Sequence, residues 1–153
     1  RSTCWTLRQG AGTGPGQRAT VTVPLSTGSE RLRGINGGPQ IPVGAIVNGV
    51  ELLIEGQQSI AGNSLQYATL YSGGAPLINP LAFTLSEGVD GIVTVGSPTE
   101  QWNTTLTPAF INAADFGLII YTDGTFAYTM SIDHAQIRIY YTPPLLLMSH
   151  FIY

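Results

Sequence analysis

Apolar and polar residues alternate along much of the chain, and a period of two residues is typical of half-buried β-strands. In segment 41–56, Val50, Leu52 and Ile54 fall on one strand face and two glutamates fall on the other. Segment 64–74 alternates in the same way and ends in Ser-Gly-Gly, a turn sequence. No stretch keeps the 3.6-residue apolar period of a helix for more than about two turns. The pattern therefore predicts a β-rich fold without long helices.

Glycine and proline interrupt these segments every eight to twelve residues, which is the spacing of an all-β sandwich or barrel. Asp123-Gly124 is a two-residue hairpin signal. In segment 106–117, Thr107 can cap a helix whose first residue is Pro108, so one helical turn is expected there. We predict an all-β fold, an antiparallel β-sandwich of jelly-roll type with one short helical turn. Its seven or eight short strands are expected at 19–25, 41–56, 64–74, 81–85, 91–96, 116–122, 125–130 and 133–141.

The 153 residues suit one domain that can bury a core of its own. Residues 1–40 are predicted to form an Arg/Gly-rich N-terminal arm and a first strand, with 27–40 loop-like except for a short strand that Leu32 could start. Residues 41–142 form the sandwich core, to which strand 19–25 is added. Residues 143–153 form an apolar C-terminal tail, because Pro143-Pro144 ends the last strand.

Charged side chains are scarce, at 10% of the residues, whereas an ordinary soluble domain has about 25%. The sequence contains no Lys. A chain this poor in charge either covers itself with uncharged polar residues or buries its surface against neighbours, and we favour burial against neighbours. The net charge of −3, without clustered basic residues, argues against nucleic acid as the main partner.

The charges are also unevenly placed, with a net +4 in the first 33 residues and −7 in the remainder. Arg8 and Arg18 lie in the basic part, and opposite charges at two ends of a subunit would suit head-to-tail contacts between copies. A basic arm that is merely solvated explains the same pattern. Cys4 is the only cysteine, so no intrachain disulfide forms. The sequence starts at Arg1 without a signal-peptide pattern, so we expect a processed start or an incomplete sequence.

The adjacent pair Asp133-His134 raises the question of catalysis. Consecutive side chains of a strand point to opposite faces, so two neighbours cannot act together as an acid–base pair. In 134–141 the pattern places Ala135, Ile137, Ile139 and Tyr141 on one face and His134 on the other. We expect Asp133 to cap the turn that enters the strand and His134 to be half-exposed.

The remaining candidates for chemistry also favour structural roles. Two His and one Cys have no metal-ligand spacing. Glu51 and Glu55 share a strand face at about 13–14 Å, too far apart for a glycosidase pair. The sequence "GAGTGPG" lacks the Lys and the helix that follow the glycines of a phosphate loop. Asn103 begins the pattern Asn-Thr-Thr, an N-glycosylation acceptor that often occurs by chance. We therefore expect a protein that is not an enzyme, with no catalytic, cofactor-binding or metal-binding residue.

Aromatic residues leave carbohydrate binding open. The candidates are Trp5, Trp102, Tyr67 and Tyr71. Alternating tyrosines on a strand more often belong to a core or to an interface, and this is the interpretation we favour.

Several segments resemble, in order, a β-sandwich domain that is widespread in bacteriophage structural proteins and bacterial surface proteins. They are "IPVGAIVNGVELLIEG", "LYSGG", "WNTTLTPAFINAADFGLIIYT" and "SIDHAQIRIYYT", within residues 41–142. The resemblance implies a building or adhesion module and carries over no catalytic residue. At the matched positions, we expect Trp102 to anchor the core, and Asn112 and Asp115 to close the turn before Phe116-Gly117.

The tail carries the predicted assembly interface, together with Arg8 and Arg18. Nine residues cannot span a bilayer, and no charge keeps this segment in solution. It could fold back over its own sandwich. We favour docking on a neighbouring subunit by addition of a strand to an exposed sheet edge. The apolar tail residues are Leu145, Leu146, Leu147, Met148, Phe151, Ile152 and Tyr153.

These observations predict a phage virion structural protein, either a capsid decoration protein or a subunit of a tail or fibre, that works by self-association. Its partners would be copies of itself and other virion proteins, without membrane or nucleic acid. The alternative is a glycan-binding adhesin module of a tail or cell surface, for which a cell-surface glycan is the partner.

Overall fold

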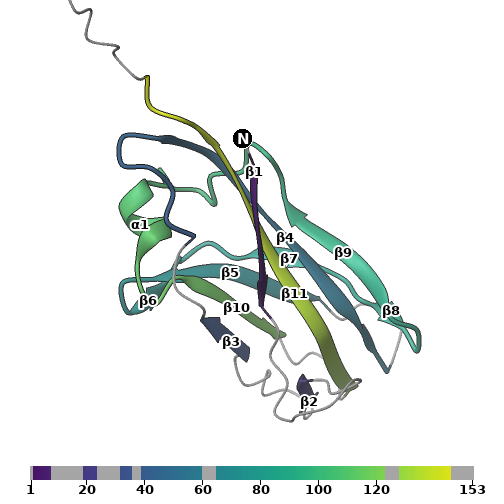
Figure 1. Cartoon of the computed structure of the whole chain (residues 1–153). Helices are drawn as coiled ribbons and strands as arrows, with labels where there is room; N and C mark the ends of the chain where they lie inside the picture. The colour runs from purple at the N-terminus through teal and green to yellow at the C-terminus, as the bar shows by residue number, and fades with distance from the viewer. Residues whose placement is uncertain are drawn as a thin grey trace, which may run out of the picture.

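Two β-sheets pack against each other in the computed structural model, which describes residues 2–7, 19–23, 32–35, 39–59, 65–122 and 128–145 (Figure 1). The first sheet contains β1 (Ser2–Leu7), β2 (Ala19–Val23), β4 (Ile46–Gln58), β8 (Ser86–Glu87), β9 (Gly91–Gly96) and β11 (Tyr128–Thr142). The second sheet contains β3 (Leu32–Ile35), β5 (Gln66–Ser72), β6 (Ala75–Pro76), β7 (Leu81–Phe83) and β10 (Gly117–Thr122). All strand pairs in these described segments are antiparallel except β4 with β8.

The strand order is that of a jelly roll. Apart from β1 and the two-residue strands, the first sheet has the order β2-β11-β4-β9 and the second β3-β10-β5-β7. Within the described segments, each sheet thus has four main strands in jelly-roll order, and the chain passes between the sheets as in a double Greek key. The predicted fold class, an antiparallel β-sandwich with one short helical turn, is confirmed. That helix is α1 (Pro108–Asn112), where the Thr107 hydroxyl accepts a hydrogen bond from the Phe110 N–H at 3.2 Å.

The sandwich includes more of the first forty residues than the sequence predicts. The strand expected at 19–25 is β2, and the short strand that Leu32 could start is β3, which pairs with β10. β1, which pairs with β11, was not predicted. Arg-rich segment 8–18 and hairpin residues Asp123-Gly124 lie outside the described residues. No helix in the described part of the chain is long and apolar enough to cross a membrane.

The core lies between the two sheets and contains the alternating residues that the sequence assigned to it. Val50, Leu52 and Ile54 on β4 are fully buried, and so are Ile137 and Ile139 on β11. Burial of this apolar surface is the main stabilising contribution to such a sandwich.

Among the described residues, Trp102 is the largest fully buried side chain, with only 1% of its surface exposed. Its indole Nε1–H donates a hydrogen bond to the Val50 carbonyl at 3.0 Å, so the ring is held against β4 and its polar atom is paired. The expected role of Trp102 as a core anchor agrees with this position.

Candidate functional site

The Asp133-His134 pair lies inside β11, and the predicted position of Asp133 is wrong. The strand begins at Tyr128, so Asp133 does not cap a turn at its start. A register shift against β4 between Ile132 and His134 makes Asp133 the extra residue of a β-bulge. Because the bulge interrupts the alternation, Asp133 and His134 are both half-buried between the buried Ile132 and Ala135. From His134 onward the predicted alternation holds, because Ala135, Ile137 and Ile139 are buried and His134 is half-exposed.

Chemistry at this bulge has no further support in the structure. Among the hydrogen bonds and ion pairs of the described residues, none joins Asp133 to His134. The register places His134 opposite Glu55 on the neighbouring strand. No group of three or more His, Cys, Asp or Glu in the described part of the chain could hold a metal ion.

Glu51 is neutralised by an ion pair on the outer face of the first sheet. Arg138 Nη1 donates to Glu51 Oε1 at 2.8 Å, and the two residues are cross-strand partners on β11 and β4. The Glu51 side chain is 11% exposed and that of Arg138 is 34% exposed. Truncating Arg138 would leave a mostly buried carboxylate without its cation, so the pair serves structure.

Asn112 and Asp115 connect segments that are distant in the sequence, which extends the role predicted for them. The Asn112 side chain accepts from the Ile41 N–H and donates to the Ile41 carbonyl, both at 2.8 Å. The Asp115 carboxylate accepts from the N–H groups of Gly73 and Gly74 at 2.9 and 2.7 Å. These hydrogen bonds join three of the segments that carry the resemblance, so at least part of the shared pattern serves to hold the fold together.

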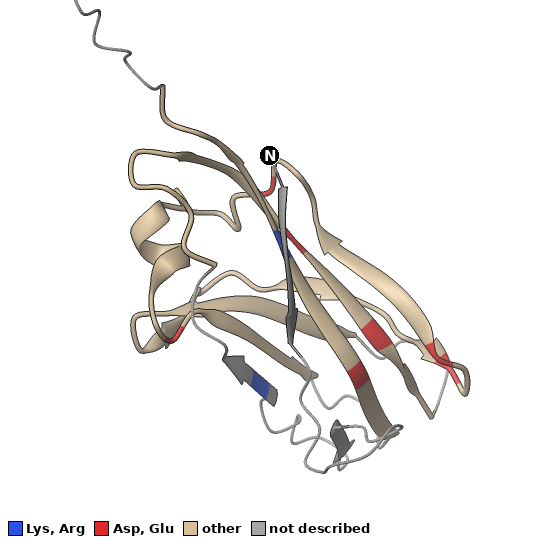
Figure 2. Cartoon of the chain, in the orientation of Figure 1, with Lys and Arg blue, Asp and Glu red and all other residues tan. Residues whose placement is uncertain are grey.

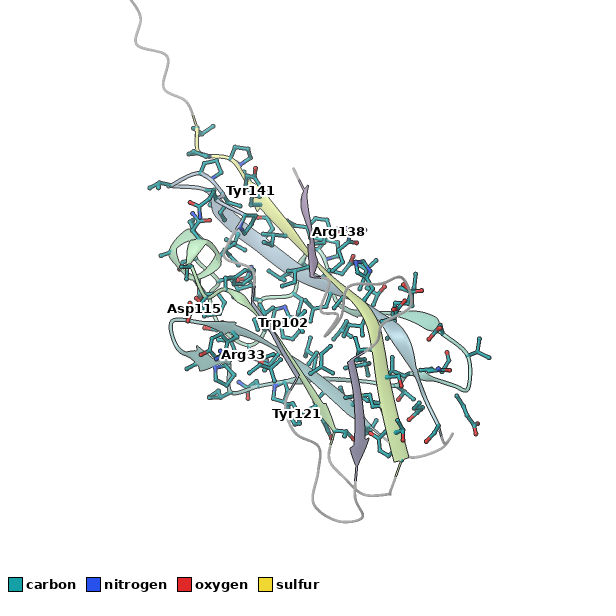
Figure 3. The ribbon with its side chains drawn as sticks, turned by 60° about the horizontal axis from the view of Figure 1, so that its bottom comes forward. Arg33, Trp102, Asp115, Tyr121, Arg138 and Tyr141 are labelled. Carbon is teal, nitrogen blue, oxygen red and sulfur yellow. The ribbon has the colours of Figure 1, made fainter. Side chains whose placement is uncertain are left out.

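Hydrogen bonding lowers the pKa of Asp115. The main cause is the N–H of Gly73, followed by that of Gly74, and the Arg33 guanidinium adds a smaller attraction. Arg33 and Asp115 lie at the same end of the second sheet (Figure 3). The carboxylate is therefore a stabilised anion that fixes a glycine turn.

The aromatic candidates for sugar binding separate into buried and half-exposed residues. Trp102 is buried, and Tyr71 is 8% exposed beneath Arg33, whose guanidinium carbon lies 4.9 Å from the ring centroid. Arg33 Nη1 also donates to the Tyr71 hydroxyl at 3.0 Å. Tyr67 stacks on Tyr121 of β10 with ring centroids 5.4 Å apart, and both rings are half-exposed. Tyr121 was not among the predicted candidates, although it also alternates on its strand.

Two further residues named from the sequence are Asn103 and Trp5. Asn103, the first residue of the glycosylation pattern, is exposed. The side chain of Trp5 lies outside the described residues.

β11 ends and β4 begins at the same end of the sandwich (Figure 1), and three exposed apolar residues lie there. Val43, Ile46 and Leu145 are 90%, 65% and 95% exposed. Ile46 pairs with Thr142, and Pro144 lies beside Gly44, so these three residues belong to one end of the molecule. We call them the apolar pole. An open hollow of about 740 Å³ adjoins it, lined by Ile46, Val47, Asn48, Pro98, Thr99, Gln101 and Tyr140.

The apolar pole is where the predicted assembly tail leaves the sandwich. Leu145 is the one predicted interface residue in the described part of the chain, and it is exposed as an interface requires. The others lie outside the described residues and remain predictions: Leu146, Leu147, Met148, Phe151, Ile152, Tyr153, Arg8 and Arg18.

Comparison with known proteins identifies the fold but no family. No protein-family model matches the chain, and no curated protein matches it. A chain in the structure of infectious bursal disease virus, Gt strain, is similar to 92% of this chain, with a TM-score of 0.51 and 16% sequence identity. A chain of the Gx strain is similar over the same share, with a TM-score of 0.48 and 15% identity. The aligned region spans 32% and 33% of these two viral chains, about a third of their length.

A third similar structure is the CBM36-1 domain of a multidomain xylanase from the hindgut metagenome of Trinervitermes trinervoides. It matches 90% of this chain and 96% of its own, with a TM-score of 0.39 and 10% identity. At these identities the comparisons concern the shape of the chain, and the viral match at 0.51 supports the β-sandwich fold.

Proposed function

We propose that this protein is a non-enzymatic structural subunit of a bacteriophage virion, a capsid decoration protein or a component of a tail or fibre, and that it works by self-association. The jelly roll is a fold of viral capsid and lectin domains, but a fold alone does not specify a function. Two further points support the proposal: the resemblance of segments within 41–142 to phage structural domains, and the viral chain that shares the fold.

The observation that carries the proposal is the apolar pole. Val43, Ile46 and Leu145 are all more than 60% exposed where a tail with six apolar residues in its last eight follows. Figure 2 shows that the described strands around this end carry few charged residues. Clustered apolar surface with little charge around it is typical of a protein–protein contact. Association would remove this surface from water.

The native mass of the full chain tests the proposal. We expect an oligomer, measured by light scattering or native mass spectrometry over a range of concentrations, rather than the 16.2 kDa of one chain. An antibody against the protein should also label intact phage particles. A chain that stays monomeric at all concentrations, or particles without the protein, would contradict the proposal.

The glycan-binding module is the second candidate, and the half-exposed Tyr67–Tyr121 pair favours it. Aromatic rings with a polar hydroxyl at one end suit ligands that present both apolar and polar surface. A glycan array with the wild-type protein and with Tyr67→Ala and Tyr121→Ala variants tests this role. Loss of binding in both variants would support the glycan-binding role. If the wild-type protein binds no glycan on the array, the glycan-binding role is contradicted and only the structural role remains.

A further inference from the structure

The sandwich has one long sheet edge that lies entirely within the described residues, and it is β9. In the described part of the chain, β9 pairs with β4 on one side and with no strand on the other. Its six residues, Gly91–Gly96, include no charge and no proline. Charged residues and prolines are the usual means by which natural proteins block an edge against pairing, so β9 is an unprotected template for another strand.

The other edges are less suitable. In the second sheet, β7 has three residues and follows Pro80, and β6 has two residues and contains Pro76. Both are short and interrupted by proline, as protected edges are. The strands β1, β2 and β3 adjoin segments outside the described residues.

The core is incompletely covered at this edge, which is a second and independent observation. Val93 on β9 and Leu81 on β7 pack against the core, but both remain partly exposed. The two strands lie near each other at the open side of the sandwich. Val89 and Ile92 beside the same edge are 68% and 67% exposed. An added strand with apolar side chains would cover this surface and satisfy the outward backbone groups of β9.

We infer that the free edge of β9 binds the C-terminal tail, residues 145–153, of a second copy of the chain as an added β-strand. This inference rests on the proposed self-association and names its two surfaces. The tail supplies nine residues without an Asp, Glu or Arg, and apolar residues fall on both of its strand faces. One face would cover Val93 and Leu81, and the other would lie beside Ile92.

The tail of the same chain is too short to reach this edge. Thr142 lies level with Ile46, whereas the near end of β9, Gly96, lies level with Glu51. Leu145 is three residues beyond Thr142, so the tail must return about 27 Å along the sheet and cross three strand spacings, about 14 Å. The direct path is about 30 Å, which is also the full length of nine extended residues. No residue would remain to pair with β9, so the donor must be another molecule.

Two variants separate the donor from the acceptor. Deletion of 145–153 removes the donor strand and keeps the edge, whereas Val93→Lys places a charge on the inner side of the edge and keeps the tail. Each variant alone should have the mass of a monomer, and an equimolar mixture should form a one-to-one complex. Ile78→Lys is the matched control, because Ile78 is a 90% exposed isoleucine outside both β9 and the apolar pole, and this variant should assemble as the wild-type chain does.

The outcomes distinguish the inference from the proposed function. A wild-type chain that is a monomer contradicts both. Assembly of the wild-type chain that persists in the deletion or in Val93→Lys overturns the inference and leaves self-association intact. A further variant, Ile46→Lys at the apolar pole, tests the alternative: assembly lost in Ile46→Lys but kept in Val93→Lys would place the tail in the hollow beside the pole.

Hydrogen exchange keeps the test valid if Val93→Lys fails to fold. Backbone amides of 91–96 that point away from β4 should exchange slowly in the wild-type assembly and quickly after deletion of 145–153. Equal exchange of these amides in the two proteins, with the wild type assembled, would overturn the inference.

Discussion

At the scale of single residues, Trp102 contributes most clearly to the stability of the sandwich. Its side chain is fully buried, and its indole N–H is paired with Val50. Trp102→Ala should lower the free energy of unfolding by about 3–5 kcal/mol, because a large apolar contact is lost and a cavity forms. Chemical denaturation monitored by circular dichroism measures this change.

The neighbouring Asn103 provides a control for Trp102, because it is exposed in the same loop. Asn103→Ala should change the stability by much less than Trp102→Ala. A Trp102→Ala protein as stable as the wild type would show that the indole is not a core anchor and would strengthen the glycan-binding alternative.

Asp115 makes stability depend on pH in a predictable direction. Because the Gly73 and Gly74 N–H groups lower its pKa in the folded state, its contribution is present above the pKa of an unfolded aspartate. The contribution is lost as the pH falls through the lowered pKa of the folded protein. The stability difference between the wild type and Asp115→Asn, measured by denaturation from pH 7 to pH 3, should therefore narrow at acidic pH. A difference that stays constant would contradict this role.

The sequence predicts individual positions well where alternation is regular and poorly where it is interrupted. The buried faces of β4 and β11 follow directly from a period of two residues, as Leu52 and Ile137 show. Asp133 was misplaced because a bulge adds one residue to one strand, and nothing in the local alternation reveals the register of the partner. The contacts of Asn112 with Ile41 span 71 positions, so a motif indicates them only as a shared pattern.

At the scale of elements, the bulge in β11 explains how one strand serves two neighbours. Residues 128–132 pair with β2 and residues 135–140 pair with β1, so the bulge falls between the two zones. Buried residues alternate as Tyr128, Met130 and Ile132 before it and as Ala135 and Ile137 after it. Removal of the extra residue would leave this alternation uninterrupted.

A deletion tests whether Asp133 is a spare residue of the strand. Deleting Asp133 should leave the buried face intact and change the unfolding midpoint little. Deleting Ser131 moves Ile132 and Asp133 back by one strand position, so that Asp133 takes the buried position of Ile132. This deletion should lower the free energy of unfolding by about 2–5 kcal/mol. Thermal denaturation of the two deletions measures the contrast, and equal damage from both would contradict the assignment of the bulge.

The sequence also underestimated the extent of the sheets. β1 was assigned to an arm because a glycine- and arginine-rich segment follows it, and β3 was expected only as a short strand that Leu32 could start within a loop. Their positions depend on pairing with β11 and β10, which lie more than 80 residues away in the sequence. Long-range pairing of this kind is invisible to local composition. Local composition likewise could not predict that β9 is an edge strand, because this depends on the pairing of all the other strands.

At the scale of the whole molecule, two mechanisms of assembly make opposite predictions about salt. Association through the uncharged tail and β9 should be nearly independent of ionic strength. Association through the basic segment around Arg8 and Arg18 should weaken with salt, because exposed charges are screened over about 8–10 Å at ordinary ionic strength. Weak salt dependence is expected here because so few residues are charged and the tail has no acidic residue or arginine.

The native mass at 0.05 M and 1 M NaCl distinguishes the two mechanisms, and we expect the oligomer to persist at both concentrations. Cooling provides the complementary measurement, since contacts made by apolar burial weaken at low temperature. Dissociation on cooling with no effect of salt would agree with strand addition by an apolar tail. Dissociation in 1 M NaCl alone would move the interface to the basic N-terminal segment and make Arg8→Ala and Arg18→Ala, rather than deletion of the tail, the changes that abolish assembly.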